Sequence, residues 1–148
     1  MRISDSTMEK LLLRSGAATA EQIANLKEEV SKLKRPLKEL AIQNDLIDNR
    51  GIAKAFSDYA QIPFIELEPR DIQMDILQKL PERVARQYNA VVFKMDPDGT
   101  YYLAMDDPDD VQAVNFIQKD LGSNTKIFIA SIDNLQSVLE MYRSNVNE

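Results

Sequence analysis

The densest group of side chains that could do chemistry is the acidic segment Asp106-Asp107-Pro108-Asp109-Asp110. Its carboxylates could bind Mg²⁺ or Ca²⁺ through oxygen, but the segment lacks the spaced acidic ligands and the closing glutamate of a calcium loop. Aspartates are also favoured at the start of a helix, where they accept hydrogen bonds from free N–H groups and complement the helix dipole. We therefore interpret this acidic cluster as a helix start and predict no metal site.

Composition excludes several kinds of catalytic site, because the 148 residues include no cysteine and no histidine. Zinc sites built on thiolate or imidazole ligands, histidine-based triads and disulfide bonds are therefore ruled out. No glycine is followed by lysine, so the chain has no GxxxxGK[ST] loop of the kind that nucleotide hydrolysis needs. We expect a chain that is not an enzyme and that uses no cofactor.

Charge divides unevenly along the chain. Residues 1–60 carry 10 basic and 9 acidic side chains, whereas residues 61–148 carry 8 basic and 15 acidic ones. A polyanion is bound mainly by basic side chains that neutralise its phosphates, so we expect no nucleic acid partner, and any anionic ligand belongs to the first half. The apolar run Leu11–Leu13 is too short for a signal peptide or a membrane span, which predicts a cytoplasmic protein without direct membrane insertion.

A hairpin is expected directly before the acidic cluster. The runs Val91–Phe93 and Tyr101–Leu103 are rich in β-branched and aromatic residues, which favour strands. Between them, Asp96-Pro97-Asp98-Gly99 has proline and glycine at turn-favoured positions. These segments predict two antiparallel strands joined by a tight turn.

A helix and a third strand are expected after the hairpin. In Asp106-Asp107, an aspartate can cap a helix whose first residue is Pro108, because proline has no N–H to leave unpaired there. The helix would run to about Leu121 and end at Gly122. The strand Thr125–Ile129 follows and should lie parallel to the second strand, which completes a ββαβ unit.

Further helices are expected on both sides of this ββαβ unit. Asp75–Leu80 and Pro81–Tyr88 read as two short helices, the second of them opened by Pro81. Ser131 should cap a last helix that reaches about Tyr142, and residues 144–148 are expected to fray.

The first half is predicted to be a helical repeat. Two hairpins, each a short helix, a turn and a longer helix, match at an offset of 29 residues, and neither could bury its apolar stripe alone. The alternative is a coincidence between two amphipathic hairpins. The matched pairs are Met8/Leu37, Leu11/Leu40, Leu13/Ile42, Thr19/Asp48 and Ile23/Ile52. The expected helix starts are capping boxes at Ser6 and at Thr19 with Gln22, then Pro36 and Asp48.

The fold class that follows is α+β. Residues 1–61 should form a four-helix subdomain of two repeated hairpins, and residues 62–148 an α+β subdomain with a three-stranded sheet. Residues 62–70 are the expected linker, because Pro63 disfavours helix at Ile62 and the residues after it alternate apolar and acidic.

Three segments together resemble the N-terminal domain of the secretion ATPases, the motor ATPases of type II secretion and type IV pilus assembly. They are Ile62-Pro63-Phe64-Ile65-Glu66-Leu67, then Leu80-Pro81-Glu82 with Ala85-Arg86, then Leu103-Ala104-Met105-Asp106-Asp107-Pro108. The resemblance covers nearly the whole chain. It implies a docking and regulatory domain that precedes ATPase domains and binds the cytoplasmic part of an inner-membrane platform protein, and hence a location peripheral to that membrane. The docking face is not identified by the resemblance.

One branch of that family binds cyclic di-GMP through two tandem copies of RLGxxLxxxGxxxxxxLxxxLxxQ. This chain retains the hydrophobic frame but lacks both Arg-Leu-Gly openings and both glutamines. A cyclic di-GMP surface would have to use Gly16, Arg35 and Lys38. Glu9 and Asp45 oppose it, because they replace glycine with carboxylates beside which an anion is disfavoured. We expect a docking module, with a cyclic di-GMP sensor as the alternative.

Overall fold

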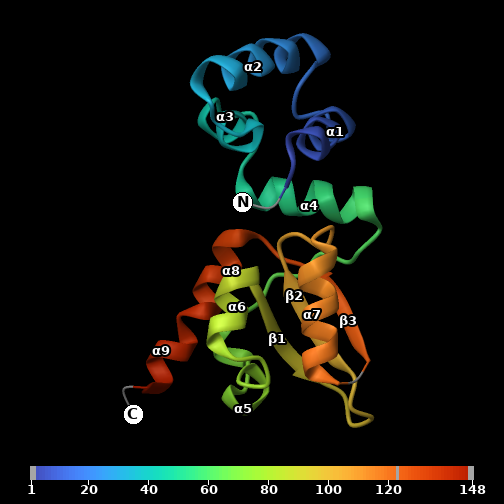
Figure 1. Cartoon of the computed structure of the whole chain (residues 1–148), viewed down its shortest axis with the longest axis vertical. Helices are drawn as coiled ribbons and strands as arrows, with labels where there is room; N and C mark the ends of the chain where they lie inside the picture. Colours follow the sequence, from blue (N-terminus) through green and yellow to red (C-terminus); the bar gives the residue numbers. More distant parts are fainter. Residues whose placement is uncertain (1–2, 123, 147–148) are drawn as a thin grey trace.

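The chain folds into a helical half above a half built on a β-sheet (Figure 1). The computed structural model describes residues 3–122 and 124–146. The predicted α+β class is confirmed. Among the described residues, no helix is both long and apolar enough to cross a lipid bilayer.

The helical half consists of α1 (Asp5–Ser15), α2 (Ala20–Leu33), α3 (Leu37–Gln43) and α4 (Asn49–Ala60). The predicted offset of 29 residues holds in three dimensions. Thr19 and Asp48 both act as N-caps, and the backbones of Gly16 and Asp45 both take a positive φ, of 78° and 58°. The paired core positions Met8/Leu37, Leu11/Leu40 and Ile23/Ile52 are all buried.

The start of α1 differs from the prediction at Ser6. Ser4 is the N-cap, and its hydroxyl oxygen accepts a hydrogen bond from the backbone N–H of Thr7 at 3.2 Å. The equivalent helix of the second hairpin, α3, contacts the first turn of α1, because the backbone N–H of Leu37 donates to the Asp5 carboxylate at 3.0 Å. Asp5 is therefore the residue that joins the starts of the two short helices.

The sheet contains β1 (Ala90–Met95), β2 (Tyr101–Met105) and β3 (Thr125–Ile129), in that order. β1 pairs antiparallel with β2, and β2 pairs parallel with β3, so the predicted hairpin and parallel third strand are confirmed. The register shifts between Val92 and Lys94, which leaves Phe93 as an extra residue in β1. At the hairpin turn, Gly99 has a φ of 92°, a conformation that glycine adopts without strain.

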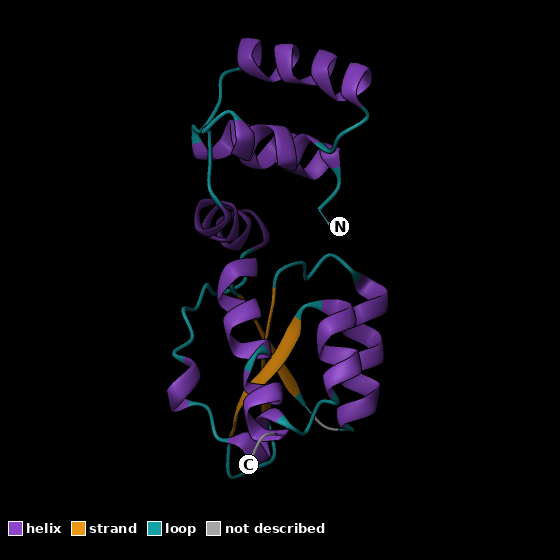
Figure 2. Cartoon of the chain, turned by 90° about the vertical axis from the view of Figure 1, so that its left-hand side faces the viewer, coloured by secondary structure: helices purple, strands orange, loops and turns teal. Residues whose placement is uncertain are grey.

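Helices cover both faces of the sheet, as Figure 2 shows. They are α5 (Met74–Leu77), α6 (Glu82–Tyr88), α7 (Val111–Leu121), α8 (Ile132–Leu139) and α9 (Met141–Val146), and a 3₁₀ turn, η1 (Pro69–Asp71), precedes them. The predicted helix 75–80 is shorter, since α5 ends at Leu77. At and just after this helix end, the carbonyls of Leu77 and Leu80 accept hydrogen bonds from the buried Tyr142 hydroxyl.

The predicted last helix is divided in two at Glu140. The guanidinium of Arg86 donates to the Leu139 carbonyl at 3.2 Å, at the acceptor that a continuous helix would offer to Arg143. The N–H of Arg143 donates to Glu140 instead. Of the residues expected to fray, 144–146 belong to α9, and residues 147–148 lie outside the described part of the chain.

The segment expected to be a linker is hydrogen-bonded to the sheet half. The N–H of Ile129 donates to the Pro63 carbonyl at 2.8 Å, and the N–H of Ile65 donates to the Ile129 carbonyl at 2.9 Å. Leu67 and the side chain of Asn134 exchange two hydrogen bonds, at 2.7 and 2.9 Å. These contacts hold residues 63–67 against β3 and α8.

Buried apolar side chains form two clusters. One lies around the sheet and includes Val91, Leu103 and Leu135, and the other lies among α1–α4 and includes Met8 and Phe56. Ile129, at the end of β3, belongs to the helical cluster. The two halves therefore meet where β3 ends beneath α4.

Candidate functional site

The acidic cluster is a turn followed by a helix cap. The Asp107 carboxylate accepts from the N–H of Asp109 at 3.1 Å, and the Asp107 carbonyl accepts from the N–H of Asp110 at 3.2 Å. The N-cap of α7 is Asp110, whose carboxylate accepts from the N–H of Ala113 at 3.1 Å. The predicted cap at Asp106-Asp107 and the predicted first residue Pro108 are therefore wrong. The chain first turns at Asp107, and the helix begins three residues later than predicted, at Val111.

Asp107 is the one charged side chain that is buried within the described residues, with 4% of its surface exposed. The pKa of its carboxyl is raised from 3.8 to about 6, chiefly by burial and also by the nearby charges of Asp106, Asp109 and Asp110, while the hydrogen bond from the Asp109 N–H lowers it. In the described part of the chain, no group of three or more acidic side chains is arranged to hold a metal ion. This cluster therefore shapes the β2–α7 connection.

The three residues predicted to face cyclic di-GMP lie in different surroundings. Arg35, which lies just before α3, pairs with Glu39 on that helix, with its Nε 2.8 Å from the carboxylate. Lys38 borders a small hollow between the halves that Asp106 also lines. Gly16 ends α1, about 16 Å along that helix from Asp5, which contacts the start of α3. Gly16 is therefore not adjacent to Arg35 and Lys38.

A hollow of about 570 Å³ lies between the start of α1 and the second half of α2. Its charged side chains are Asp5, Glu9 and Lys27, and the Nζ of Lys27 is 2.9 Å from the Glu9 carboxylate. The remaining lining residues are Ser6, Val30, Ser31 and Leu37. With two carboxylates and one lysine that is already paired, the hollow does not favour a dianion.

Three aromatic rings form a second surface feature, on one face of the sheet. Tyr102 and Phe128 stack with their ring centroids 5.6 Å apart, and Phe93 meets Phe128 edge-on at 5.5 Å. The Nζ atoms of Lys94 and Lys126 lie 4.9 and 5.4 Å from the centroid of the Tyr102 ring. We call these five residues the aromatic–lysine surface.

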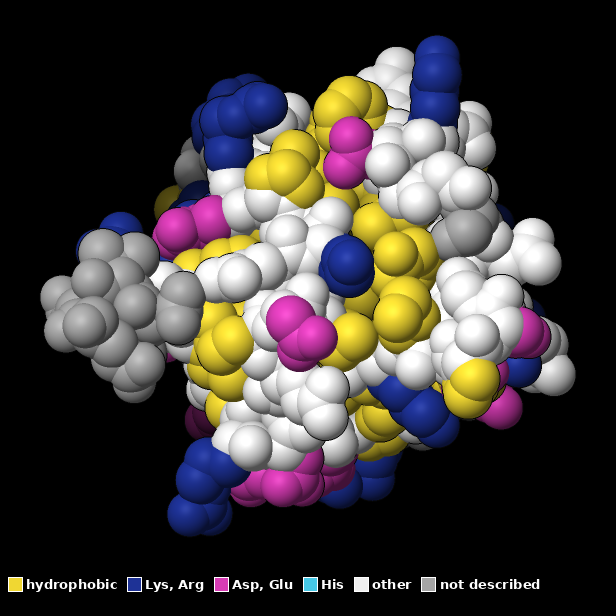
Figure 3. All heavy atoms as spheres, turned by 90° about the horizontal axis from the view of Figure 1, so that it is seen from below, with side chains coloured by type: hydrophobic (Ala, Val, Ile, Leu, Met, Phe, Trp, Pro, Cys, Tyr) yellow, Lys and Arg dark blue, Asp and Glu magenta, His cyan; other side chains and the backbone are white. Residues whose placement is uncertain are grey.

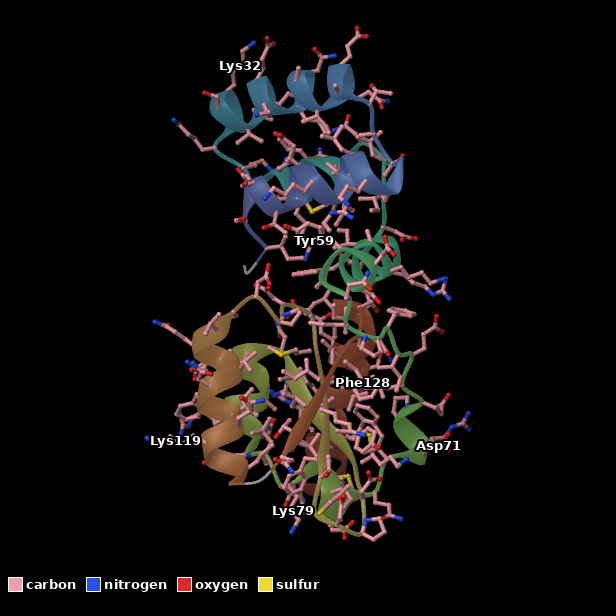
Figure 4. The ribbon with its side chains drawn as sticks, turned by 90° about the vertical axis from the view of Figure 1, so that its right-hand side faces the viewer. Lys32, Tyr59, Asp71, Lys79, Lys119 and Phe128 are labelled. Carbon is pink, nitrogen blue, oxygen red and sulfur yellow. The ribbon has the colours of Figure 1, made fainter. Side chains whose placement is uncertain are left out.

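The aromatic–lysine surface is partly open. Figure 4 shows Phe128 on the side of the sheet that faces the segment around Asp71, away from Lys119 on α7. A hollow of about 190 Å³ adjoins it, lined by Asp71, Gln73, Ile76, Phe93, Lys94 and Met95. By contrast, the lower end of the molecule mixes hydrophobic side chains with charges of both signs (Figure 3).

Sequence reasoning did not identify this surface. Strand alternation alone places Tyr102 and Phe128 on one face, because the register pairs Tyr102 with Lys126 and Ala104 with Phe128. Phe93 lies on this face by the same alternation, because Val91 pairs with Ala104. The register shift in β1, which the sequence does not reveal, brings Lys94 opposite Tyr102. The alternation of Lys126 and Phe128 was the available signal.

Comparison with known proteins identifies the class to which this fold belongs. Residues 60–146 match the model of the MshEN domain, and the match covers more than half of the chain. The chain belongs to the MshEN domain family. The matched range begins at the end of α4 and includes the whole sheet half.

Two curated relatives are type IV pilus assembly ATPases called PilB. That of Myxococcus xanthus is 25% identical over 134 residues, which are 90% of this chain and 23% of the relative. That of Thermus thermophilus is 26% identical over 98 residues, which are 66% of this chain and 11% of the relative. This chain thus spans less than a quarter of either relative.

Solved structures share the fold over both halves. A structure of MshE with cdg gives a TM-score of 0.73 at 22% identity, covering 90% of this chain and 96% of that one. The N-terminal domain of XpsE gives a TM-score of 0.68 at 18% identity, covering 95% and 96%. With the family match, these comparisons confirm the predicted resemblance to the N-terminal domains of secretion and pilus ATPases.

Proposed function

We propose that this chain is the docking and regulatory N-terminal domain of a type II secretion or type IV pilus assembly ATPase, and that it binds the cytoplasmic part of the inner-membrane platform protein. The observation that carries the proposal is the MshEN family match over residues 60–146. The low share of the PilB relatives that the chain spans supports it, because most of each relative lies outside the matched segment.

The division of work within such an ATPase supports docking over catalysis. The 148 residues contain no GxxxxGK[ST] loop, so nucleotide hydrolysis would belong to ATPase domains elsewhere in the full-length protein. Those domains are then the second partner of this chain. The platform protein would hold the ATPase at the cytoplasmic side of the inner membrane, which makes the attachment peripheral.

The test is a titration of this chain with the purified cytoplasmic domain of the platform protein encoded beside it. We expect a dissociation constant below about 10 µM, which corresponds to about −7 kcal/mol. The control is the cytoplasmic domain of a platform protein from an unrelated secretion system. No binding at tens of micromolar, with the chain folded by circular dichroism, would refute the docking function.

Cyclic di-GMP binding is the alternative function, and the solved relative named with cdg is the observation that favours it. The hydrophobic frame of the tandem cyclic di-GMP motif is retained here, with Leu12, Ile23 and Ile52 at motif positions. The pairing of Arg35 with Glu39 and of Lys27 with Glu9 opposes it, because both cations already have a carboxylate partner. A bound dianion would have to compete with these pairs.

We therefore expect cyclic di-GMP to bind more weakly than about 10 µM. Calorimetry at low salt is the measurement, since salt would screen a weak electrostatic site. The variants are Arg35→Ala and, as a matched control on the exposed side of α2, Lys32→Ala. Tighter binding that Arg35→Ala abolishes and Lys32→Ala retains would make this chain a second-messenger sensor.

A further inference from the structure

β3 has an outer edge that is paired only at its end. The backbone N–H and carbonyl groups along this strand point alternately toward β2 and outward. The Asn124 carbonyl accepts from Tyr101 of β2, and the N–H of Ala130 donates to Met105 of β2. Ile129 instead bonds outward, to Pro63 and Ile65. By the same alternation, the N–H and carbonyl of Ile127 point away from β2. β3 lies at the open side of the sheet in Figure 1.

The pairing at Ile129 shows that this edge accepts an extended segment. Phe64 forms a single parallel bridge with Ile129, and residues 63–65 supply both of its outward hydrogen bonds. Within the described residues, no other segment forms a β-bridge with the outer edge of β3. The edge position at Ile127 is therefore available for one more extended segment from another molecule.

The side chains beside this edge define the chemistry of that segment. On one face of the sheet, Lys126 is exposed and Phe128 is half-buried, and both contact the Tyr102 ring. The hydroxyl of Tyr102 donates to the Asp96 carboxylate at 2.9 Å, which fixes the ring. On the other face, Ile127 is half-buried against the core of the sheet half. A cross-strand neighbour would therefore meet a cation at 126 and apolar surface at 127 and 128.

Charge favours an acidic occupant. The half of the chain that contains β3 has 8 basic and 15 acidic side chains, yet two of those basic residues, Lys94 and Lys126, flank the same ring. An acidic residue opposite Lys126 would pair with it at cross-strand distance. Symmetric pairing of β3 with the β3 of a second copy does not offer that complement, because Thr125-Lys126-Ile127-Phe128-Ile129 contains no acidic residue.

We propose that the platform protein docks by adding an extended strand to the outer edge of β3, with an acidic residue opposite Lys126 and apolar residues opposite Ile127 and Phe128. This inference rests on the proposed docking function and assigns its surface. Main-chain hydrogen bonds to Ile127 supply part of the affinity, and the aromatic–lysine surface supplies the specificity.

The test combines affinity with amide exchange in the titration against the platform domain. Lys126→Glu is expected to raise the dissociation constant at least tenfold, or about 1.4 kcal/mol. Lys119→Glu, on α7 at the other side of the sheet, is the matched control and is expected to change the constant less than about twofold. Exchange of the Ile127 amide, followed by NMR, should slow by about tenfold or more when the platform domain is added.

The outcomes separate this inference from the docking function on which it rests. If wild-type chain does not bind, both fail. If wild-type chain binds while Lys126→Glu binds equally well and the Ile127 amide is unaffected, docking stands and the β3 edge is the wrong surface. If the Ile127 amide becomes protected in the chain alone as its concentration rises, with a dimer in sedimentation, the edge serves self-association and the inference is overturned.

Discussion

The variant Phe56→Ala is expected to lower the free energy of unfolding by about 3–5 kcal/mol, the usual effect of truncating a buried phenylalanine. Phe56 is fully buried in α4, and its ring lies 6.4 Å from the ring of Tyr59. Because α1 packs against α4, the loss leaves a cavity that the neighbouring helix can only partly fill. A typical domain has about 5–15 kcal/mol in total, so much of the stability would be lost.

Urea unfolding followed by circular dichroism measures this effect. The control is Leu13→Ala on α1, whose side chain is 45% exposed and whose truncation should change stability by about 0.5 kcal/mol or less. Equal effects of the two substitutions would contradict the placement of Phe56 in the core of the helical half.

The same variant tests the proposed division into residues 1–61 and 62–148. With two units, amide exchange should accelerate in α1–α4 by about tenfold more than in β1 and β2. The contacts at the boundary oppose independence, since Ile129 of β3 lies in the helical cluster and residues 63–65 bond to it. Equal acceleration in both halves would mean that the chain unfolds as one cooperative unit.

Local signals in the sequence were sufficient to predict a helix start where neighbouring residues alone determine the structure. The capping box of Thr19 and Gln22 forms as predicted, because both hydrogen bonds lie within four consecutive residues. The start of α1 was misplaced because Ser4 and Ser6 are both good caps, and propensity does not distinguish them. The choice agrees with Ile3, which is buried in the helical cluster just before the helix.

Features that depend on contacts between distant residues were not predictable. The break before α9 depends on Arg86, which lies 53 residues before the carbonyl it contacts, and the β1 register shift depends on pairing with β2. The candidate site differed from the prediction for a local reason. Arg35 was proposed as an anion ligand, whereas its guanidinium pairs with Glu39, only four residues along the chain.

The variant Asp107→Asn is expected to stabilise the protein by about 1–2 kcal/mol at pH 8 and to have little effect near pH 4. Burial raises the pKa of Asp107 from 3.8 to about 6, so the folded protein holds this proton more tightly than the unfolded chain does. The stability that this group contributes is therefore fully present below about pH 4 and is lost as the pH rises through about 6. Asparagine keeps an oxygen that accepts from the N–H of Asp109 and removes the buried charge.

The expected gain is less than the roughly 3 kcal/mol that a shift of two pKa units represents, because the asparagine amide brings N–H donors into a buried position. Urea midpoints at pH 4.5 and pH 8 measure it, as the difference between the variant and the wild type at each pH. Asp120→Asn, an exposed change on α7, is the control and should give nearly the same small difference at both values. If the stability difference between Asp107→Asn and the wild type is also independent of pH, the wild-type Asp107 carboxyl does not titrate between these two pH values. The turn before α7 would then be held by its hydrogen bonds without an opposing buried charge.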